Sequence, residues 1–484
     1  MTMARRDFLS VAAAAGTAAL TSSWAHARET KEIRVAVIGV NGRGPTHLAS
    51  LASNVTAICD VDSEILARQV AKFEKDFGRK VKAYSDYRDM VISSDIDAVT
   101  IATPNHTHSL IAIAAINAGK HVYCEKPVSH NVWEGQQLVA AAQRSGLAVQ
   151  CGTQSRSAPA VQRAVEFVRS GQLGKLQYVI GTCYKPRLPI GKLDKPLEIP
   201  KTVDYDLWCG PAAKVDLYRP RLHYDWHWDY NTGAGDLGNQ GIHQMDIARW
   251  FVGKDELAPR TISIGARVGY DDAGNTANSQ VVLHDYAEAP IVFETRGLPR
   301  SKAGQRTWEA SMDIYRRSQM GVVVQCEGGF VMVPTSYVDA FAYDRDGKLV
   351  KHFNGWGNHF GNWLDAVAAG DPSQLNAPIR QGHLSSALCH VGNVSHRTGE
   401  QRTANEIADM VAGNPLLAAS FDRLATHLRA NDVDVDSAPG ALTAGTWLTV
   451  DPVAEQVVDN AAAAKLWKRE YRSGFEVPQL ASQA

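Results

Sequence analysis

Two short motifs carry residue types suited to redox chemistry on a small molecule. Gly39-Val40-Asn41-Gly42-Arg43-Gly44 is a glycine-rich turn between an apolar run and a helical pattern, and such a turn offers backbone N–H groups to a pyrophosphate. Glu125-Lys126-Pro127 follows a later apolar run. A lysine in that place projects from the carboxyl edge of a parallel sheet, where a nicotinamide would lie. Together the motifs predict a dinucleotide enzyme with an amine against its substrate.

The sequence around the glycine turn favours NAD as the dinucleotide. Asp60 ends the next predicted strand, about 20 residues after Gly39, where a carboxylate can bind the adenosine ribose hydroxyls and repel the 2′-phosphate of NADP. Arg43 lies close by and could soften that preference, so NADP stays open. Asn41 occupies the position of the second glycine of the G-x-G-x-x-G pattern, where the backbone must approach the pyrophosphate. We expect Gly42 to supply the backbone freedom that Asn41 lacks. A tight turn with no ligand is the alternative interpretation.

Polar residues after two other predicted strands reach the same sheet edge. Ala102-Thr103-Pro104-Asn105-His106-Thr107-His108 lies where a cofactor would pass through the crevice, although a solvated turn is the alternative. An ammonium beside a cationic nicotinamide has a lowered pKa, which brings Lys126 toward acid–base chemistry. A surface ion pair with Glu125 is the alternative for this lysine. The candidate cofactor contacts outside the glycine turn are Asp60, Thr103, Pro104, Asn105, His108, Glu125, Lys126 and Gln154.

These motifs together resemble the Gfo/Idh/MocA oxidoreductase family, whose members include glucose–fructose oxidoreductase and inositol dehydrogenase. The resemblance covers roughly residues 32–400. It implies a Rossmann domain, a second α/β domain whose open sheet often forms the oligomer interface, and a Lys126 that orients and polarises the reacting hydroxyl or carbonyl. The family also has an Asp and a His four positions apart. In Gly238-Asn239-Gln240-Gly241-Ile242-His243, Asn239 takes the place of the aspartate and His243 that of the catalytic histidine.

The departure at Asn239 changes the expected proton chemistry. An amide can hold a hydroxyl but cannot accept its proton, so the resemblance assigns the role of general base to His243, with Lys126 assisting. Upstream, His223-Tyr224-Asp225-Trp226-His227-Trp228-Asp229-Tyr230 interleaves aromatic and polar groups in a way that suits a sugar. A hydrophobic clamp at a domain or subunit contact is the equal alternative. The candidate substrate contacts are Arg156, Trp226, His227 and Asp246.

The elements that must position these residues indicate an α/β protein in two main domains. From residue 32 to 154, strands and helices alternate as in a doubly wound parallel sheet, which predicts an NAD(P)-binding Rossmann domain. Residues 155–402 contain strands in series, including 261–270, and predict an α/β domain with a large, mostly antiparallel open sheet. Residues 403–484 form a C-terminal extension that could cap the active site or a subunit interface.

The first 27 residues predict export. Arg5-Arg6-Asp7-Phe8-Leu9 precedes an alanine-rich stretch and Ala25-His26-Ala27, an arrangement that resembles a twin-arginine signal. An ordinary secretory signal is the alternative, and both predict a periplasmic or secreted protein with no membrane segment after signal removal. The twin-arginine route carries folded proteins, so the nucleotide is expected to be bound before export and held tightly.

The composition limits the classes of binding partner that we expect. The formal net charge of -1 gives no electrostatic case for nucleic acid or an anionic membrane. Seven widely spaced cysteines predict free, mostly buried thiols and no metal site. The expected partners are a small carbohydrate-like substrate and further copies of the chain, in a dimer or tetramer.

The predicted function is hydride transfer between a tightly bound nicotinamide and a carbinol carbon of a sugar, cyclitol or glycoside. A redox-neutral glycosidase is the first alternative: transient oxidation acidifies a neighbouring C–H, the glycosidic bond is eliminated, and the hydride returns. A non-catalytic sugar-binding protein is the second, against which the presence of both Lys126 and His243 argues.

Overall fold

The amino-terminal half of the described chain builds a six-stranded parallel sheet. The computed structural model describes residues 32–308 and 312–480, so the predicted export signal lies outside them. The strand order is β3-β2-β1-β4-β5-β6, as the predicted Rossmann topology requires. Its strands are β1 (Val35–Ile38), β2 (Val55–Cys59), β3 (Lys82–Tyr84), β4 (Ala98–Ile101), β5 (His121–Cys124) and β6 (Val149–Cys151). The apolar runs of β1, β4 and β5 are almost entirely buried because helices cover both faces.

Helices alternate with these strands and start at identifiable signals. Asp62 caps α2 by accepting from the backbone N–H groups of residues 64 and 65, and Asn131 caps α5 in the same way at residue 134. The first helix begins at Gly44 in the glycine turn, and Pro45 fits the first turn of a helix. The helices are α1 (Gly44–Ser50), α2 (Ser63–Phe77), α3 (Tyr87–Val91), α4 (His108–Asn117) and α5 (Val132–Ser145).

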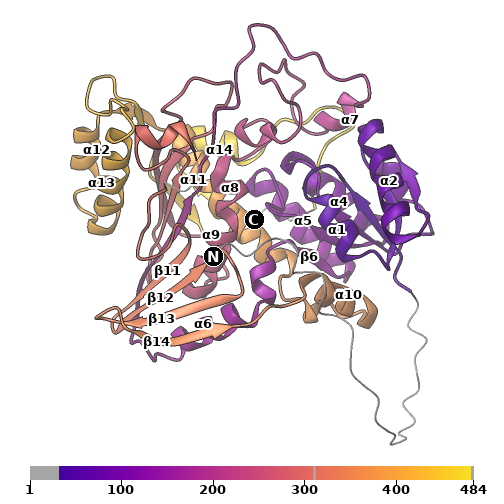
Figure 1. The fold of residues 1–484 in the computed structure, drawn as a ribbon, viewed down its shortest axis with the longest axis horizontal. Helices are drawn as coiled ribbons and strands as arrows, with labels where there is room; N and C mark the ends of the chain where they lie inside the picture. Colours follow the sequence, from indigo (N-terminus) through magenta and orange to yellow (C-terminus); the bar gives the residue numbers. More distant parts are fainter. Residues whose placement is uncertain (1–31, 309–311, 481–484) are drawn as a thin grey trace, which may run out of the picture. The chain divides into compact units, whose positions relative to one another are not determined.

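A twelve-stranded mixed sheet forms the second layer of the molecule (Figure 1). Its main path runs β14-β13-β12-β11-β7-β10-β9-β8-β16-β15, and β17 pairs with β8 and β18. The predicted mostly antiparallel sheet is confirmed, with β7 and β10 as a parallel pair. Its longer strands are β7 (Leu176–Tyr184), β8 (Arg260–Ala266), β9 (Ser279–His284), β10 (Ile291–Arg296), β11 (Met320–Cys326), β12 (Gly329–Pro334), β13 (Asp339–Asp344) and β14 (Leu349–Asn354).

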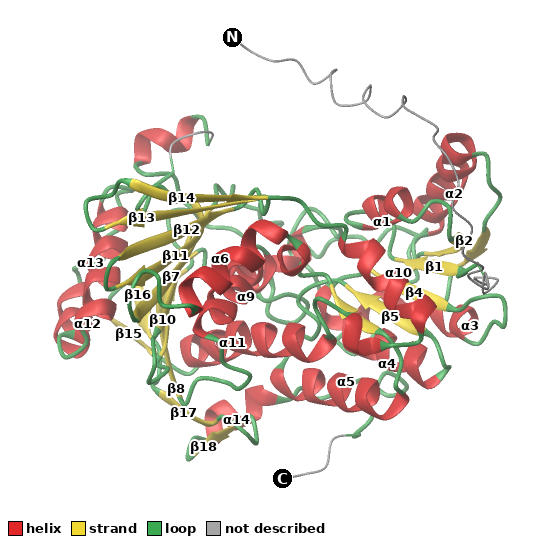
Figure 2. Ribbon diagram, turned by 90° about the horizontal axis from the view of Figure 1, so that it is seen from below, coloured by secondary structure: helices red, strands yellow, loops and turns green. Residues whose placement is uncertain are grey.

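Helices cover the two faces of the large sheet differently (Figure 2). On the face toward the Rossmann sheet, α6 (Pro159–Arg169), α9 (Gly241–Val252) and α11 (Ile379–Arg397) share one apolar core with the strands. On the opposite face, α12 (Ala404–Val411) and α13 (Pro415–Arg429) build a second core with β8, β9 and β10. The helix α10 (His359–Ala369) instead packs Phe360 and Trp363 against the Rossmann domain.

The C-terminal extension is more regular than its sequence suggests. It adds β16 (Leu442–Ala444), β17 (Leu448–Asp451) and β18 (Gln456–Val458) to the large sheet, next to β15 (Glu400–Arg402), and then forms α14 (Ala461–Trp467). Sequence patterns missed these short strands. The predicted strand at residues 261–270 was too long, since β8 ends at Ala266 and Gly269 takes a positive φ of 87°.

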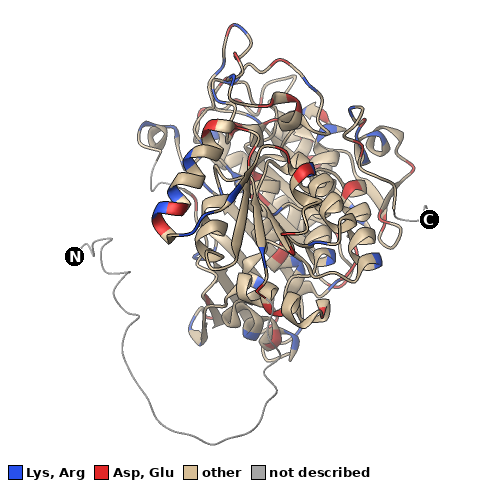
Figure 3. Ribbon diagram, turned by 90° about the vertical axis from the view of Figure 1, so that its right-hand side faces the viewer, with Lys and Arg blue, Asp and Glu red and all other residues tan. Residues whose placement is uncertain are grey.

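The distribution of charged residues and the state of the cysteines are as the composition predicts. Lys and Arg alternate with Asp and Glu over the elements visible in Figure 3. All seven cysteines are buried and free, as predicted. Within the described residues, no helix is both long and apolar enough to span a bilayer.

Candidate active site

A cavity of about 800 Å³ opens at the carboxyl ends of the Rossmann strands and reaches the second domain. The glycine turn, the loop after β4 and the end of β5 supply one wall, and residues from 207 to 243 together with the large sheet supply the other. The predicted residues that line it are Gly39, Asn41, Gly42, Arg43, Asp60, Thr103, Pro104, Asn105, His108, Glu125, Lys126, Gln154, Trp226, His227, Asn239 and His243.

The glycine turn has the shape of a nucleotide cradle. Gly39 has φ 80°, and a Cβ there would lie 2.8 Å from the backbone nitrogen of Thr103, so no larger residue fits. A Cβ on Gly42 would meet nothing within 4 Å, which leaves open space beside its backbone. The backbone N–H of Val40 donates to Asp60 Oδ2 over 2.8 Å, so the turn and the acidic residue are fixed together.

Glu125 is the centre of a buried polar network. Its Oε1 accepts from Arg43 Nε at 3.1 Å and from Gln154 Nε2 at 3.4 Å, and it lies 3.1 Å from His47 Nε2. Burial would raise the pKa of Glu125, but the hydrogen bond from His47 and the charges of Arg43 and Lys126 hold that pKa well below its usual range. Glu125 is therefore a fixed anion beneath the site.

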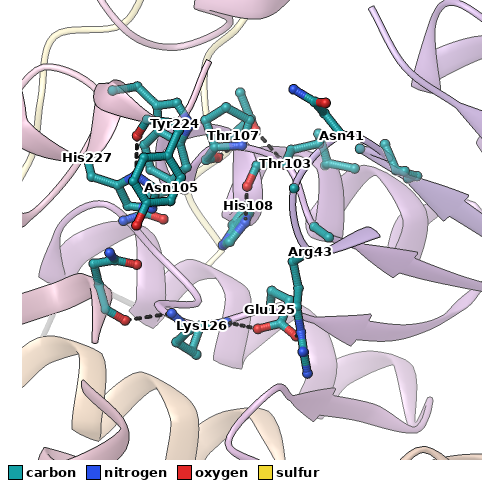
Figure 4. A pocket seen from close by; sticks show the side chains of 18 of the residues that line it. Asn41, Arg43, Thr103, Asn105, Thr107, His108, Glu125, Lys126, Tyr224 and His227 are labelled. Atoms are coloured by element: carbon teal, nitrogen blue, oxygen red, sulfur yellow. Dashed lines mark hydrogen bonds and ion pairs between the residues drawn. The ribbon is translucent and has the colours of Figure 1, made fainter. Parts of the chain in front are cut away.

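Lys126 reaches across to the second domain. Its Nζ donates to the backbone carbonyl of Asn239 over 2.6 Å, and Figure 4 shows it beside Glu125 in the wall of the cavity. Burial lowers the pKa of Lys126, and the carboxylate of Glu125 opposes that change. The contact seen for Asn239 is thus made by its main chain, while the predicted role of its amide stays a prediction. This bond fixes the ammonium where a substrate oxygen can reach it.

His243 lies in the same end of the cavity, on α9. Burial lowers its pKa to about 3, and the charge of Lys126 adds to that effect. The ring is therefore neutral at ordinary pH and can accept a proton. Its Nδ1 is buried without a hydrogen-bond partner. The ring of Tyr337 packs beside it, with 5.7 Å between the ring centroids.

The loop after β4 is held by its histidines. The ring nitrogens of His108 lie 2.7 Å from the carbonyl oxygen of Pro127 and 2.8 Å from that of Thr103, so this ring ties the loop to the segment that carries Lys126. Those of His106 lie 2.8 and 3.2 Å from the carbonyl oxygens of Trp208 and Thr232 in the second domain. The loop predicted as a cofactor contact is therefore a rigid bridge between the two walls.

The aromatic segment forms the wall opposite Lys126. Trp226 and His227 stack with 3.6 Å between ring centroids, and both line the cavity. Tyr224, in a left-handed conformation with φ 67°, also lines it (Figure 4). Burial lowers the pKa of His227 to about 3, so this wall presents a neutral imidazole among aromatic faces.

Three predicted residues lie away from the cavity lining. Arg156 and Asp246 form a buried bidentate ion pair, with Arg156 Nε 2.8 Å from Asp246 Oδ2, and Ser385 also donates to Asp246. The pair is completed inside the protein, so the structure gives no support to the expected substrate contacts. Gly44 packs its α-carbon against Gly39, where a Cβ would lie 2.0 Å from the Gly39 carbonyl oxygen. Its role is close packing of α1 on the turn.

Several lining residues were missed by sequence reasoning. Tyr337, in a turn after β12 with φ 56°, enters beside His243, and Thr335 in the same turn and Met320 at the start of β11 also line the cavity. Tyr87 and Phe475 line the cavity from α3 and from the C-terminal segment. For Tyr337 and Phe475 the local signal is an aromatic residue in a loop, which does not show where that loop will pack.

These residues fit a bound dinucleotide. Open space lies beside Gly42, and Asn105 Nδ2 is buried in the lining without a hydrogen-bond partner. The glycine turn would hold the pyrophosphate, Asp60 the adenosine ribose, and the segment around Lys126 the nicotinamide. In the residues that the structure describes, no group of three His, Cys, Asp or Glu side chains is placed to hold a metal ion.

Two family models match the chain. Residues 33–153 match an oxidoreductase family with an NAD-binding Rossmann fold, and residues 175–298 match the C-terminal alpha/beta domain of the same Gfo/Idh/MocA group. Together the matches cover just over half of the chain.

The curated relatives include an inositol dehydrogenase and a levoglucosan dehydrogenase. Inositol 2-dehydrogenase of Salmonella paratyphi B is 30% identical over 158 residues, which is 31% of this chain and 46% of that protein. Levoglucosan dehydrogenase of Pseudarthrobacter phenanthrenivorans is 27% identical over 198 residues, or 41% of this chain and 42% of the relative. The chain thus spans about half the length of the curated relatives that it matches.

A solved structure shares the fold. The WlbA dehydrogenase from Bordetella pertussis, in complex with NADH and UDP-GlcNAcA, superposes with a TM-score of 0.54 at 17% identity. The match covers 74% of this chain and 94% of the other. At this identity it supports the architecture alone.

Proposed function

The chain belongs to the Gfo/Idh/MocA oxidoreductase family, and we propose that it transfers a hydride between a tightly bound NAD and a carbinol carbon of a sugar, cyclitol or glycoside. The observation that carries this proposal is the meeting of Lys126 and His243 in one cavity with the glycine turn. The two groups differ in charge, because Lys126 is an ammonium held by a carbonyl and His243 is neutral.

Two features of the lining support NAD over NADP. The Asp60 carboxylate lines the cavity and is held by the backbone N–H groups of Val40 and Asp62. Arg43, which could have bound a 2′-phosphate, instead forms an ion pair with Glu125. A phosphate beside Asp60 would therefore meet a carboxylate without a matching cation from Arg43.

Lys126 and His243 have different roles in the proposed proton transfer. The nicotinamide, when bound, supplies the hydride acceptor. Lys126 donates a hydrogen bond to the reacting oxygen and stabilises the negative charge that develops there. His243 accepts the hydroxyl proton, since its lowered pKa keeps the ring unprotonated in the working pH range. In the reverse direction, the imidazolium returns that proton to the new hydroxyl.

The opposite wall suits a neutral polyol. The stacked rings of Trp226 and His227 offer apolar faces to the C–H side of a sugar ring, with polar edges for its hydroxyls. Lining cations and anions balance, since Arg43 and Lys126 face Asp60 and Glu125. This balance favours an uncharged substrate.

A redox-neutral glycosidase is a second candidate. Oxidation followed by elimination requires a base for a C–H proton in addition to the group that handles the hydroxyl proton. Tyr337 and His227 are further acid–base groups lining the same end of the cavity as His243. Deuterium from solvent at the carbon next to the oxidised one, with substrate and product at the same oxidation state, would favour this reaction. Net production of a lactone or ketosugar would exclude it.

We also propose that the protein is exported with its nucleotide already bound. The support comes from the sequence, in the arginine pair Arg5-Arg6 and the Ala25-His26-Ala27 site. Folding in a reducing compartment agrees with seven buried free thiols.

The test starts from the purified mature protein. Its bound nucleotide is identified after denaturation, and the protein is then mixed with monosaccharides, cyclitols and glycosides while the fluorescence of the bound reduced nicotinamide is followed. Lys126→Met and His243→Gln should lower turnover about 10²–10⁴-fold while nucleotide content stays at the parent level.

Lys175→Met serves as the matched control, because Lys175 is an exposed lysine outside the cavity. Its turnover should equal that of the parent. Full activity in both Lys126→Met and His243→Gln would overturn the catalytic assignment. A parent protein that neither retains nor binds NAD(H) would overturn the proposal as a whole.

A further inference from the structure

The last described segment, residues 468–480, runs back from the large sheet to the Rossmann domain. Phe475 in this segment lines the cavity, although it lies far along the chain from the nucleotide motifs. The side chain is 6% exposed, so it is part of the protein interior. The two family matches end at residue 298, so neither of them covers this segment.

The position of Phe475 within the cavity follows from its neighbours. The Phe475 ring lies 5.8 Å from the guanidinium of Arg88, the residue after Tyr87, which also lines the cavity. Val477 packs in the apolar cluster that contains Tyr87 and Ile111. Tyr87 and Ile111 line the cavity and share that cluster with Cys59, the residue before Asp60. In the strand order, β2, which ends at Cys59, and β5, which precedes Lys126, lie on opposite sides of β1. A dinucleotide with its ribose at Asp60 and its nicotinamide at Lys126 would place its adenine on the β2 side of β1.

The segment is fixed at several points by polar contacts. Arg469 Nη2 donates to Asn231 Oδ1 over 2.8 Å, and Arg472 Nη1 donates to the carbonyl of Gly210 over 3.1 Å. Tyr471 donates to Glu134 Oε1 over 3.2 Å, and the backbone N–H of Leu480 donates to Gln137 Oε1 over 2.6 Å. The segment is therefore bonded to α5 on one side and to residues 210–231 of the opposite wall on the other.

The ring of Phe475 is held by cations that leave it little freedom. The Arg472 guanidinium lies 4.9 Å from the ring centroid, and Arg88 approaches the same ring. An aromatic side chain so confined loses little conformational entropy when a planar base packs against it.

We propose that Phe475 contacts the adenine of the bound dinucleotide and that residues 468–480 hold the nucleotide in the site. This inference rests on the proposed function, because it needs the dinucleotide that the Rossmann domain binds. It gives the predicted tight binding a physical cause: the segment that contacts the adenine end is itself held by bonds to α5 and to residues 210–231.

The test compares two ligands that differ in the adenosine. Binding of NADH and of reduced nicotinamide mononucleotide, which lacks the adenosine, is measured by nicotinamide fluorescence on protein freed of its nucleotide. Phe475→Ala should weaken NADH binding about tenfold, the effect expected from losing one aromatic contact to a base. Binding of the mononucleotide should not change. Phe475→Leu, which keeps the apolar bulk, should lie between the two proteins.

Two controls keep the outcomes separate. Val453→Ala alters a residue of the same extension that is 83% exposed and should bind NADH as the parent does. Melting temperatures without nucleotide show whether Phe475→Ala is folded. Equal NADH affinity in the parent and folded Phe475→Ala, or equal weakening of both ligands, would overturn the inference. A parent that binds no NADH would instead overturn the proposed function.

Discussion

The pKa of His243 depends on the charge of Lys126. Lys126 is a buried ammonium that donates to the main chain of Asn239, and His243 is a buried imidazole whose pKa falls partly because of that ammonium. We propose that these two residues supply the acid and the base of the reaction. Asn239 stands where the family resemblance predicts an aspartate.

Removing the ammonium should change the titration of His243. The pKa of His243 is about 3 in the parent, so the neutral base persists as pH falls through 5 and the acid limb of kcat/KM lies below that value. In Lys126→Met the loss of the positive charge should raise the pKa of His243. NMR titration of the histidine ring signals in the parent and the variant measures the difference.

Lys175→Met is the control for this experiment, since it removes an exposed charge elsewhere. Its His243 signal should titrate as in the parent. An unchanged His243 pKa in Lys126→Met would show that burial alone lowers it.

At the level of elements, two glycines of the same turn should have different roles, Gly39 in folding and Gly42 in nucleotide binding. Gly39 has a positive φ and a backbone neighbour at the Cβ position, whereas Gly42 faces open space. Gly39→Ala should therefore lower the melting temperature. Gly42→Val should leave it close to that of the parent but weaken NADH binding at least tenfold, because the added side chain occupies the space for the pyrophosphate. Differential scanning fluorimetry and NADH fluorescence measure the two effects.

The opposite pattern, with a folded Gly39→Ala and an unfolded Gly42→Val, would mean that the turn is held differently. Parent-level NADH binding by Gly42→Val would place the pyrophosphate elsewhere.

The elements of the Rossmann half could be predicted because β1, β2, β4 and β5 are short, mostly apolar runs that end in a turn or polar residue. The pairing of the large sheet could not, since β7 lies between β10 and β11, which come more than a hundred residues later. Among site residues, those next to strand ends were found. Tyr337 and Phe475 could not be predicted as lining residues because their positions depend on how distant segments pack. Arg156 and Asp246 pair with each other outside the lining, and their places in the sequence do not reveal this pairing.

At the level of the whole molecule, Glu455 joins the extension to the rest of the chain. Its carboxylate accepts from Arg380 and lies 2.6 Å from His383 Nε2 on α11, and its carbonyl accepts from Trp467. Burial would raise the pKa of Glu455, but His383 and Arg380 lower it to about 2. A buried anion is thus one of the contacts that attach the extension.

Glu455→Gln should lower the free energy of unfolding by about 3 kcal/mol at pH 7, the scale for breaking a buried ion pair. The folded-state pKa lies below the unfolded value of about 4.3, so the stabilisation is present above pH 4.3 and disappears as pH falls toward 2. Urea unfolding at pH 7 and pH 3 should therefore show a smaller difference between parent and variant at the lower pH.

Val453→Ala, two residues away and exposed, should match the parent at both values. A difference that stays constant or grows from pH 7 to pH 3 would contradict the assigned role of the Glu455 carboxylate.

The place of Phe475 has a consequence for the order in which the protein is made. A ribosome completes the glycine turn and the six parallel strands long before it adds residues 468–480. Until then the nucleotide site lacks Phe475, and on the proposal that residues 468–480 hold the nucleotide we expect nucleotide to enter and leave the site during synthesis. The dinucleotide that the protein retains is then the one present in the compartment where residues 468–480 are added.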